Sequence, residues 1–298
     1  MTQISMCQPA LSIIIPTHAR SEILRECLLR IGAQTVRAQI EVIVVSDVVD
    51  PEVQAYCTAL GAQVPCDYIQ VSPCHQGVAR NTALKRAKAP LCLIIGDDIF
   101  LEPDACAVHM MSHDLLTRQG VVSAAVLGFT TWDPTSGITQ VMRWLERSGW
   151  QFGYLNLRRY ERTFVPVSMQ HFYTYTSHVS LPTAIARKYP FRQDIDLYGW
   201  EDVEWGTRLR DAGIGLFYQP DARAFHFHHM DLPASLRRME TLGTSAAQMA
   251  RKVPDFDRLP RGTKRFFYRL VSMFPTMTGA HRRAFLRGVV AAERAADA

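Results

Sequence analysis

The sequence predicts an α/β protein with a mixed, mainly parallel sheet flanked by helices and a helical extension at the C-terminus. Short apolar segments alternate with helix-patterned segments over the first hundred residues, which is typical of a parallel sheet covered on both faces. The 298 residues are 48% apolar and 20% charged, as in ordinary globular proteins. This composition excludes disordered, collagen-like and coiled-coil chains, and no apolar run reaches the roughly 20 residues of a membrane-spanning helix.

The first half of the chain alternates between predicted strands and helices. Apolar, β-branched runs predict strands at 11–15, 40–45, 67–71 and 91–95. Helical spacing and stop signals predict helices at 21–33, with Ser21 as N-cap, at 51–60, ending at Gly61, and at 77–88. Because parallel sheets bind ligands at the carboxyl ends of their strands, we expect residues 16–20, 46–47 and 96–99 to share one edge.

The composition changes in the second half, where all five tryptophans lie between Trp132 and Trp205. The aromatic-rich stretch 129–178 has weak periodicity and predicts mixed strands and loops. Beyond it we expect a helix at 201–212 closed by Gly213, a strand at 214–218, and helices at 233–252 and 262–290. The chain is thus expected to form a domain over 1–231, with halves at about 10–105 and 106–231, and a basic helical extension over 232–298.

Positive charge is concentrated in this extension. The whole chain has a net charge of +5, whereas residues 232–298 alone hold 13 Lys and Arg against 5 Asp and Glu. A basic amphipathic segment such as KRFFYRLVSMF is able to lie on an anionic lipid surface, which would give peripheral contact with the inner face of a membrane. We favour the alternative, in which these helices pack on the preceding domain or on a second copy in a homodimer. No nucleic-acid-binding motif accompanies the charge, so nucleic acid is not an expected partner.

Cysteine usage favours a reducing compartment. The seven cysteines include no C-x-x-C pair, which excludes a zinc knuckle and a thioredoxin-like motif. The first ten residues lack the basic and apolar regions of a signal peptide. A cytoplasmic protein with free thiols is therefore expected.

Two adjacent carboxylates, Asp97 and Asp98, follow the predicted strand 91–95. Like charges at the end of a buried strand are unfavourable unless a cation lies there, and hard oxygen ligands suit Mg²⁺ or Mn²⁺. The alternative interpretation is that the two carboxylates cap the following loop. Arg80 lies on a helix leading to the same edge, where it is able to bind a phosphate or a carboxylate.

A second carboxylate pair, Glu201 and Asp202, opens the predicted helix 201–212. Acidic residues favour a helix N-terminus for electrostatic reasons alone. Here three aromatic residues surround the pair: Tyr198, Trp200 and Trp205. Aromatic side chains are typical platforms for sugar rings, and they raise the pKa of a carboxyl group toward that of a useful base.

Three histidines fall within the four residues 226–229, which follow Pro220 at a short distance along the chain. His226 and His228 alternate along the predicted strand end, and His229 follows. Imidazoles at this spacing are typical metal or phosphate ligands, and we expect His226 to be the ligand.

These motifs occur in the order PTHAR, SD, GVARN, GDDIFLEP, GWEDVEWGTRLRDAG and YQPDARAFH. In this order the chain resembles the family 2 glycosyltransferases with the GT-A fold, over roughly residues 10–230. The resemblance implies a Rossmann-like GT-A sheet. It also implies an enzyme that moves a sugar from a nucleotide-diphosphate sugar to an acceptor hydroxyl, with inversion at the anomeric carbon.

The resemblance assigns nucleotide-sugar contacts to six residues: Pro16, Thr17, Arg20, Asp47, Arg80 and Asp97. The D-x-D motif of the family falls on Gly96-Asp97-Asp98, with glycine in place of the first aspartate. The resemblance places Mn²⁺ or Mg²⁺ on Asp98 and His226, and it makes Asp202 the catalytic base with Glu201 beside it.

Other functions remain open at this stage. A nucleotidyltransferase uses a similar fold, although PTHARSE lacks the glycine-rich basic loop that grips a triphosphate. A non-catalytic protein that binds a nucleotide sugar or a partner is a second alternative, and a metal hydrolase built on HFHH is a third. The acceptor is expected to be a glycan, a lipid-linked molecule or a protein, recognised by residues 129–200, with a weak contribution from Tyr198, Trp200 and Trp205.

Overall fold

The first half of the chain folds as its apolar segments predict. In the computed structural model, which describes residues 8–195 and 197–297, strands β1, β2 and β4 are almost wholly buried. β1 pairs in parallel with β2 and β4, and β2 pairs in parallel with β3. Residues 1–7, in which we expect no signal peptide, lie outside the described residues.

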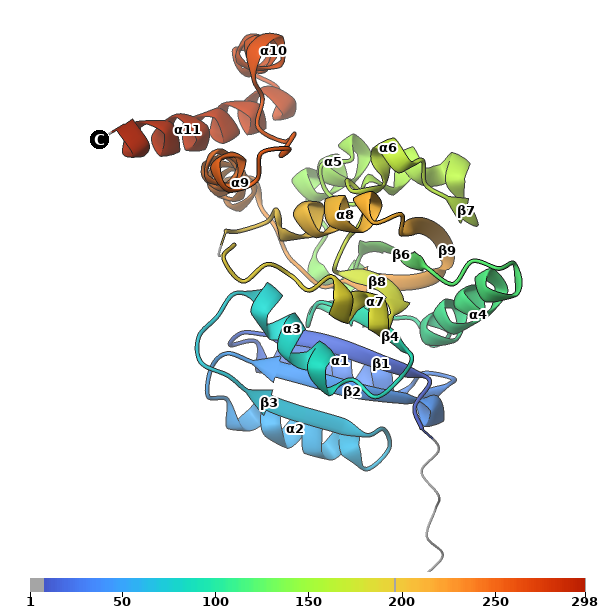
Figure 1. Cartoon of the computed structure of the whole chain (residues 1–298). Coiled ribbons are helices and arrows are strands. Elements are labelled where there is room, and N and C mark those ends of the chain that lie inside the picture. The colour runs from blue at the N-terminus through green and yellow to red at the C-terminus, as the bar shows by residue number, and fades with distance from the viewer. Residues whose placement is uncertain (1–7, 196, 298) are drawn as a thin grey trace, which may run out of the picture.

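The sheet continues into the second half as a mixed sheet (Figure 1). β8 lies antiparallel to β4 and β6, β9 is parallel to β6, and β5 and β7 pair antiparallel with β9. Its strands are β1 (Leu11–Thr17), β2 (Ile40–Ser46), β3 (Cys66–Gln70), β4 (Leu91–Ile95), β5 (Ile99–Leu101), β6 (Ala124–Trp132), β7 (Thr163–Phe164), β8 (His178–Pro182) and β9 (Gly215–His226). The predicted mixed, mainly parallel sheet is therefore confirmed for the α/β domain.

Helices cover this sheet and form the C-terminal extension. They are α1 (Ser21–Gly32), α2 (Pro51–Gly61), α3 (Gln76–Arg86), α4 (Ala105–Arg118), α5 (Gln140–Ser148), α6 (Val167–Gln170), α7 (Thr183–Lys188), α8 (Glu201–Asp211), α9 (Leu232–Lys252), α10 (Gly262–Ser272) and α11 (Met277–Asp297). None of the helices within the described ranges combines the length and hydropathy of a bilayer-crossing segment.

Several predicted boundaries are wrong. Pro16 and Thr17 belong to β1 rather than to the loop after it. Ser21 is the first residue of α1, and its hydroxyl donates to Glu52 instead of capping the helix. The strand expected at 214–218 continues to His226, because a register shift opposite Gly128 and Phe129 lets the chain pass through Pro220 within the sheet. Such irregularities are where strands tolerate proline.

In the C-terminal extension, two helices, α10 and α11, occur where one was expected over 262–290. The break falls at 273–276, because Pro275 lacks the N–H that a continuous helix needs.

Glycines let the backbones of α9 and α11 approach closely: a Cβ on Gly243 would lie 2.0 Å from the carbonyl oxygen of Phe285, and one on Gly288 would lie 1.9 Å from that of Glu240. The expected packing on the preceding domain also occurs, since Leu242 and Phe256 bury the segment before α8.

Three histidines form a hydrogen-bonded cluster in the interior of the α/β domain. His109 and His113 come from α4 and His178 from β8, and all three are buried. His109 Nε2 lies 3.1 Å from His178 Nε2, and Ser180 Oγ lies 2.8 Å from His109 Nδ1 and 2.9 Å from His113 Nε2. Burial is the main cause that lowers the pKa of each imidazole, to about 4 for His113 and His178. The cluster is therefore neutral at pH 7.

Acid is expected to destabilise the fold through this cluster. The folded-state pKa values lie below the unfolded value of about 6.5, so the unfolded chain binds more protons as the pH falls from about 6.5 toward 4. The free energy of unfolding should fall by up to about 1.4 kcal/mol per pH unit for each histidine in that window. Urea titrations at pH 7 and pH 5 should show a smaller acid loss for His113→Gln than for wild type. Replacing the exposed His18 by Gln should give no such relief, and an equal acid loss in all three proteins would contradict the assignment.

Candidate functional site

The turn between β4 and β5 is tied to the end of β1. Thr17 Oγ1 donates to Asp97 Oδ2 over 2.8 Å. Arg20 Nη1 donates to Asp97 Oδ1 over 3.1 Å and to Asp98 Oδ2 over 2.8 Å. The carboxyl ends of the two neighbouring strands thus bring together residues about 80 positions apart, as the parallel sheet predicts.

The two neighbouring carboxyl groups differ in acidity. Burial, followed by the charge of Asp98, raises the pKa of Asp97 to about 6. Burial also opposes ionisation of Asp98, but His226 and Arg20 outweigh it and lower the pKa of Asp98 to about 2. Asp98 is therefore the carboxylate that stays ionised over the whole physiological range.

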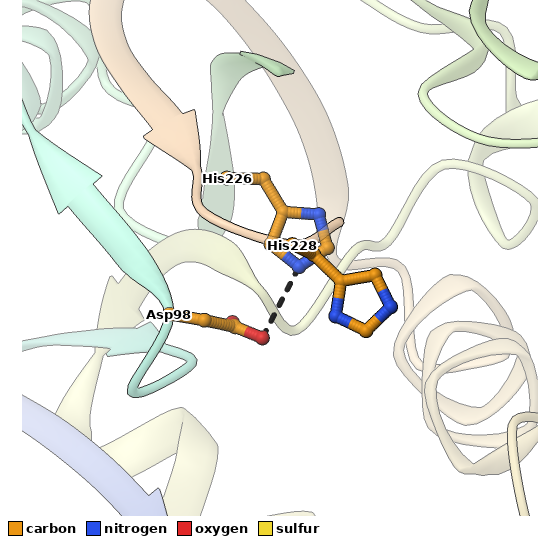
Figure 2. Close-up of side chains that lie close together, drawn as sticks. All are labelled: Asp98, His226 and His228. Atoms are coloured by element: carbon orange, nitrogen blue, oxygen red, sulfur yellow. Dashed lines mark ion pairs between the residues drawn. The ribbon is translucent and has the colours of Figure 1, made fainter. Parts of the chain in front are cut away.

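Asp98, His226 and His228 form a cluster with the composition of a metal site (Figure 2). One ligand atom from each lies within 4.8 Å of the other two. His226 Nε2 is 3.2 Å from Asp98 Oδ2, and the rings of the two histidines stack with their centroids 5.4 Å apart. The backbone fixes the arrangement, because His226 ends β9 opposite Ile99 and Phe227 N donates to the carbonyl oxygen of Asp98 over 2.8 Å.

The His228 imidazole has the character that a divalent ion requires. Burial is the largest cause that lowers the pKa of His228 to about 4, and His226 is the next. A neutral imidazole keeps a lone pair free for coordination. His226 Nδ1 is buried and has no hydrogen-bond partner among the described residues, while Trp132 stacks on the ring at 5.4 Å. One carboxylate and two imidazoles form a mixed oxygen and nitrogen ligand set, which fits a divalent transition ion such as Mn²⁺ better than Mg²⁺, because Mg²⁺ prefers oxygen ligands.

His228 is the residue of this cluster that the sequence prediction passed over in favour of His226. The H-x-H spacing was its only signal. The expected alternation along one strand face is not the reason for the contact, because β9 ends at His226 and His228 lies in the loop beyond. The loop returns the second ring onto the first.

Asp47 lies at the end of β2, as expected, and contacts the loop after β1. His18 Nδ1 is 2.6 Å from Asp47 Oδ1, and the backbone N–H of Cys74 donates to Asp47 Oδ2 over 3.4 Å. His18 is a contact that the sequence did not single out. Pro16 is buried within β1 opposite Val45, so we assign it to the core rather than to a ligand contact.

The sequence left open whether Arg80 binds a phosphate or a carboxylate. In the structure it contacts a carboxylate, that of Glu201. Its Nη1 lies 3.5 Å from Glu201 Oε1, its Nη2 donates to Gln76 Oε1 over 2.8 Å, and its guanidinium lies over the ring of Phe191. Gln76 Nε2 also donates to Glu201 Oε1 over 2.5 Å. Burial lowers the pKa of Arg80. These contacts join α3 to the first residue of α8.

Asp202 occupies the second position of α8, beside this network. Its Oδ1 accepts from the N–H of Val203 over 2.8 Å. Burial, followed by the charge of Glu201, raises the pKa of Asp202 to about 7. Glu201 Oε2 is buried without a hydrogen-bond partner among the described residues. A carboxyl group with a pKa near neutrality is suited to proton transfer at physiological pH.

The three aromatic residues around the pair have different roles. Trp205 is fully buried, donates from Nε1 to the carbonyl oxygen of Tyr189 and stacks on Phe191. The expectation that it contacts an acceptor is wrong, because no part of its side chain is exposed. Trp200 Nε1 donates to the carbonyl oxygen of Leu242 over 3.1 Å and fastens α9 to the domain. Tyr198 is 49% exposed and accepts from Arg238.

A cavity of about 410 Å³ adjoins the metal-type cluster through Phe152, whose ring centroid lies 5.4 Å from that of His226. Its lining includes three further aromatic residues and three arginines. These are Phe129, Tyr154, Tyr218, Arg147, Arg158 and Arg223. The stretch 129–200, which we expected to recognise the acceptor, supplies four of these side chains and Phe152 as well.

The comparisons with known proteins agree with this arrangement. The family model described as "Glycosyltransferase like family 2" matches residues 9–254. The fold is similar to that of a mannosyltransferase, PcManGT, from Pyrobaculum calidifontis, solved with GDP-Man and Mn²⁺, with 16% identity, a TM-score of 0.58, and coverage of 96% of this chain and 76% of that one. No curated protein matches the chain.

A second similar fold is that of TarS from S. aureus. It has 14% identity, a TM-score of 0.56, and coverage of 95% of this chain but 43% of that one. The chain thus spans less than half of the length of TarS. A form of TarS comprising residues 1–349, solved with UDP-GlcNAc, has a TM-score of 0.53, with 96% and 91% coverage and 14% identity. Since the family model covers most of the chain, the protein belongs to the glycosyltransferase-like family 2 and has the GT-A fold.

Proposed function

We propose that the protein transfers a sugar from a nucleotide-diphosphate sugar to an acceptor hydroxyl, with inversion at the anomeric carbon. The observation that carries the proposal is the cluster of Asp98, His226 and His228 at the carboxyl ends of the strands, in a chain of this family. The bound GDP-Man and Mn²⁺ of the mannosyltransferase support a metal-dependent donor.

The nucleotide side of the donor is proposed to lie along the end of β1. Arg20 and Thr17 already hold Asp97, and Asp47 faces the same loop through His18. Hydrogen-bond acceptors at Asp47 and Asp97 suit the N–H groups of a base and the hydroxyls of a ribose. Arg20 is 41% exposed at its side chain, so its guanidinium is available to a phosphate oxygen.

The proposed metal ligands are Asp98, His226 and His228. A divalent ion held there would supply positive charge to the diphosphate leaving group. Around it, Trp132 and Phe152 fix the His226 ring and exclude water from one side. Asp98 stays ionised because Arg20 and His226 face it. These residues therefore keep the Asp98 carboxylate ionised and the His226 ring oriented before the donor arrives.

Asp202 is the proposed base. Its carboxylate accepts the proton of the acceptor hydroxyl while that oxygen forms a bond to the anomeric carbon and the bond from this carbon to the diphosphate oxygen breaks. The nucleotide diphosphate leaves with the electron pair of that bond. Arg80 and Gln76 position Glu201, whose charge helps to keep the pKa of Asp202 high. The cavity beside Phe152 is the proposed acceptor region.

A donor screen tests the proposal. UDP-, GDP- and dTDP-sugars are tested by thermal shift and calorimetry with Mn²⁺, followed by assays of nucleotide release. We expect one nucleotide class to raise the melting temperature, with loss of the shift in EDTA. Arg20→Gln should weaken donor binding by about tenfold, the effect of losing one charge-assisted hydrogen bond. The control is Arg30→Gln: Arg30 is exposed and pairs with Glu26 on α1, so this variant should bind the donor like wild type. Binding without any turnover on supplied acceptors would favour a non-catalytic binding protein, and no binding of any donor would contradict the proposal.

A further inference from the structure

Helix α10 and the turn after it expose a large apolar surface. The exposed fractions are 62% for Phe266, 58% for Phe267, 43% for Leu270, 77% for Met273 and 54% for Phe274. With 3.6 residues per turn, Phe266, Phe267 and Leu270 fall within about 100° of arc, and Met273 and Phe274 follow in the turn directly after the helix. A contiguous apolar surface of this kind marks an interaction site, whereas scattered exposed apolar residues do not.

The opposite side of α10 is held against α11, so the helix is not free to turn this surface inward. Arg265 makes two hydrogen bonds to Glu293, of 2.5 and 2.6 Å. The ring of Tyr268 lies 6.2 Å from that of Phe285, and the guanidinium of Arg282 lies over it at 4.6 Å. In Figure 1, α10 lies at the end of the molecule opposite α2 and β3. The apolar face therefore points away from α11.

Basic side chains flank the apolar face. Lys264 lies on one side of the arc and Arg269 on the other, and both are exposed, as is Arg261 just before the helix. α10 contains no acidic residue, and the extension to which it belongs is strongly basic. An apolar arc rich in phenylalanine with Lys and Arg at its borders complements an anionic lipid surface, in which the aromatic rings enter the acyl boundary and the cations remain among the headgroups.

We propose that α10 and residues 273–274 form a membrane-contact surface that binds anionic phospholipid. Phe266, Phe267 and Phe274 enter the interfacial region, and Lys264 and Arg269 contact the lipid phosphates. The proposal does not depend on the proposed catalytic function, because the surface lies on the extension and uses none of the residues of the candidate active site.

The test is sedimentation of the full chain with vesicles of phosphatidylcholine alone and of phosphatidylcholine with 30% phosphatidylglycerol. We expect binding to the anionic vesicles and weakening by 0.5 M NaCl, which screens the charges. The double variant F266S/L270S should bind at least about tenfold more weakly, because it removes two apolar side chains from the interface. K264Q/R269Q should lose the preference for anionic lipid.

The matched control is M111S/L115S. Met111 and Leu115 are also exposed, at 69% and 51%, and lie four residues apart on α4, so this variant removes similar apolar surface elsewhere and should bind vesicles like wild type. Circular dichroism confirms that each variant is folded. The proposal fails if wild type stays in the supernatant, or if F266S/L270S and wild type bind equally. Sedimentation velocity tests the alternative that the surface joins two copies of the chain. The proposal also fails if wild type is a dimer, F266S/L270S is a monomer, and the two proteins bind vesicles equally.

Discussion

The variant Asp202→Asn is expected to lower the rate of sugar transfer by about 10² to 10⁴ fold, the contribution of a well-placed general base. Asparagine keeps the size of the side chain and the hydrogen bond from the N–H of Val203, but its amide does not accept the acceptor proton. The KM for the donor should stay within about twofold. The measurement is nucleotide diphosphate release with the donor found in the screen and saturating acceptor.

The pH profile provides an independent readout of the same assignment. Burial and Glu201 raise the pKa of Asp202 to about 7, and a base works only as the carboxylate. The wild-type rate should therefore fall about tenfold per pH unit below neutrality, while Asp202→Asn should lose this dependence. The other charged or titratable groups that influence Asp202 are Arg80, Tyr175 and Arg258.

Asp211→Asn is the matched control for this prediction. Asp211 ends the same helix, is exposed and pairs with Arg210, so its loss should leave the rate and the pH profile unchanged. Wild-type turnover in Asp202→Asn would show that another group accepts the proton. In that case Glu201, whose Oε2 is buried and unpaired, would be the next residue to test.

The variant Asp98→Asn is expected to abolish the metal-dependent part of donor binding and to lower turnover by about 10³ fold, because a metal contributes several kcal/mol to stabilising the leaving group. Asp98 is the one carboxylate in the cluster with His226 and His228. Its replacement leaves two neutral imidazoles and an amide, a set that binds Mn²⁺ weakly. Mn²⁺ binding is measured directly by calorimetry or electron paramagnetic resonance, without reference to activity.

Asp104→Asn controls for the change of charge near the same turn. Asp104 is exposed and precedes α4 without a side-chain capping bond, so its loss should affect neither Mn²⁺ binding nor turnover. His228→Gln distinguishes a ligand from a neighbour: about tenfold weaker Mn²⁺ binding would support His228 as the third ligand. Unchanged Mn²⁺ affinity in Asp98→Asn would place the ion elsewhere or leave the protein without one.

Patterns with a local cause were readable from the sequence. The apolar runs of β1, β2 and β4 are continuous, so their side chains are removed from water only when both faces of the sheet are covered. All three strands were predicted. The parallel arrangement then predicted that the β1 end and the Asp97–Asp98 turn meet, and Thr17 and Arg20 do contact these carboxylates. His226 was singled out through its spacing, and it lies beside Asp98.

Features that depend on contacts between distant segments were decided by the tertiary structure. Trp205 lies close to two carboxylates in the sequence, yet the fold buries its side chain against Phe191. Arg80 was assigned to a phosphate by resemblance, but the packing of α3 against α8 buries it beside Glu201. The return of the loop after β9 places His228 on the His226 ring.

The sequence by itself thus determined the strands β1 to β4 of the sheet, the edge at which they end and the chemical types of residue gathered there, because strand burial and parallel pairing follow from residue patterns within single segments. The tertiary structure decided which side chains contact one another, which carboxyl group keeps its proton to neutral pH, and which face of α10 is exposed. These depend on burial and on charges from segments far apart in the chain, and such interactions exist only once the backbone has brought the segments together.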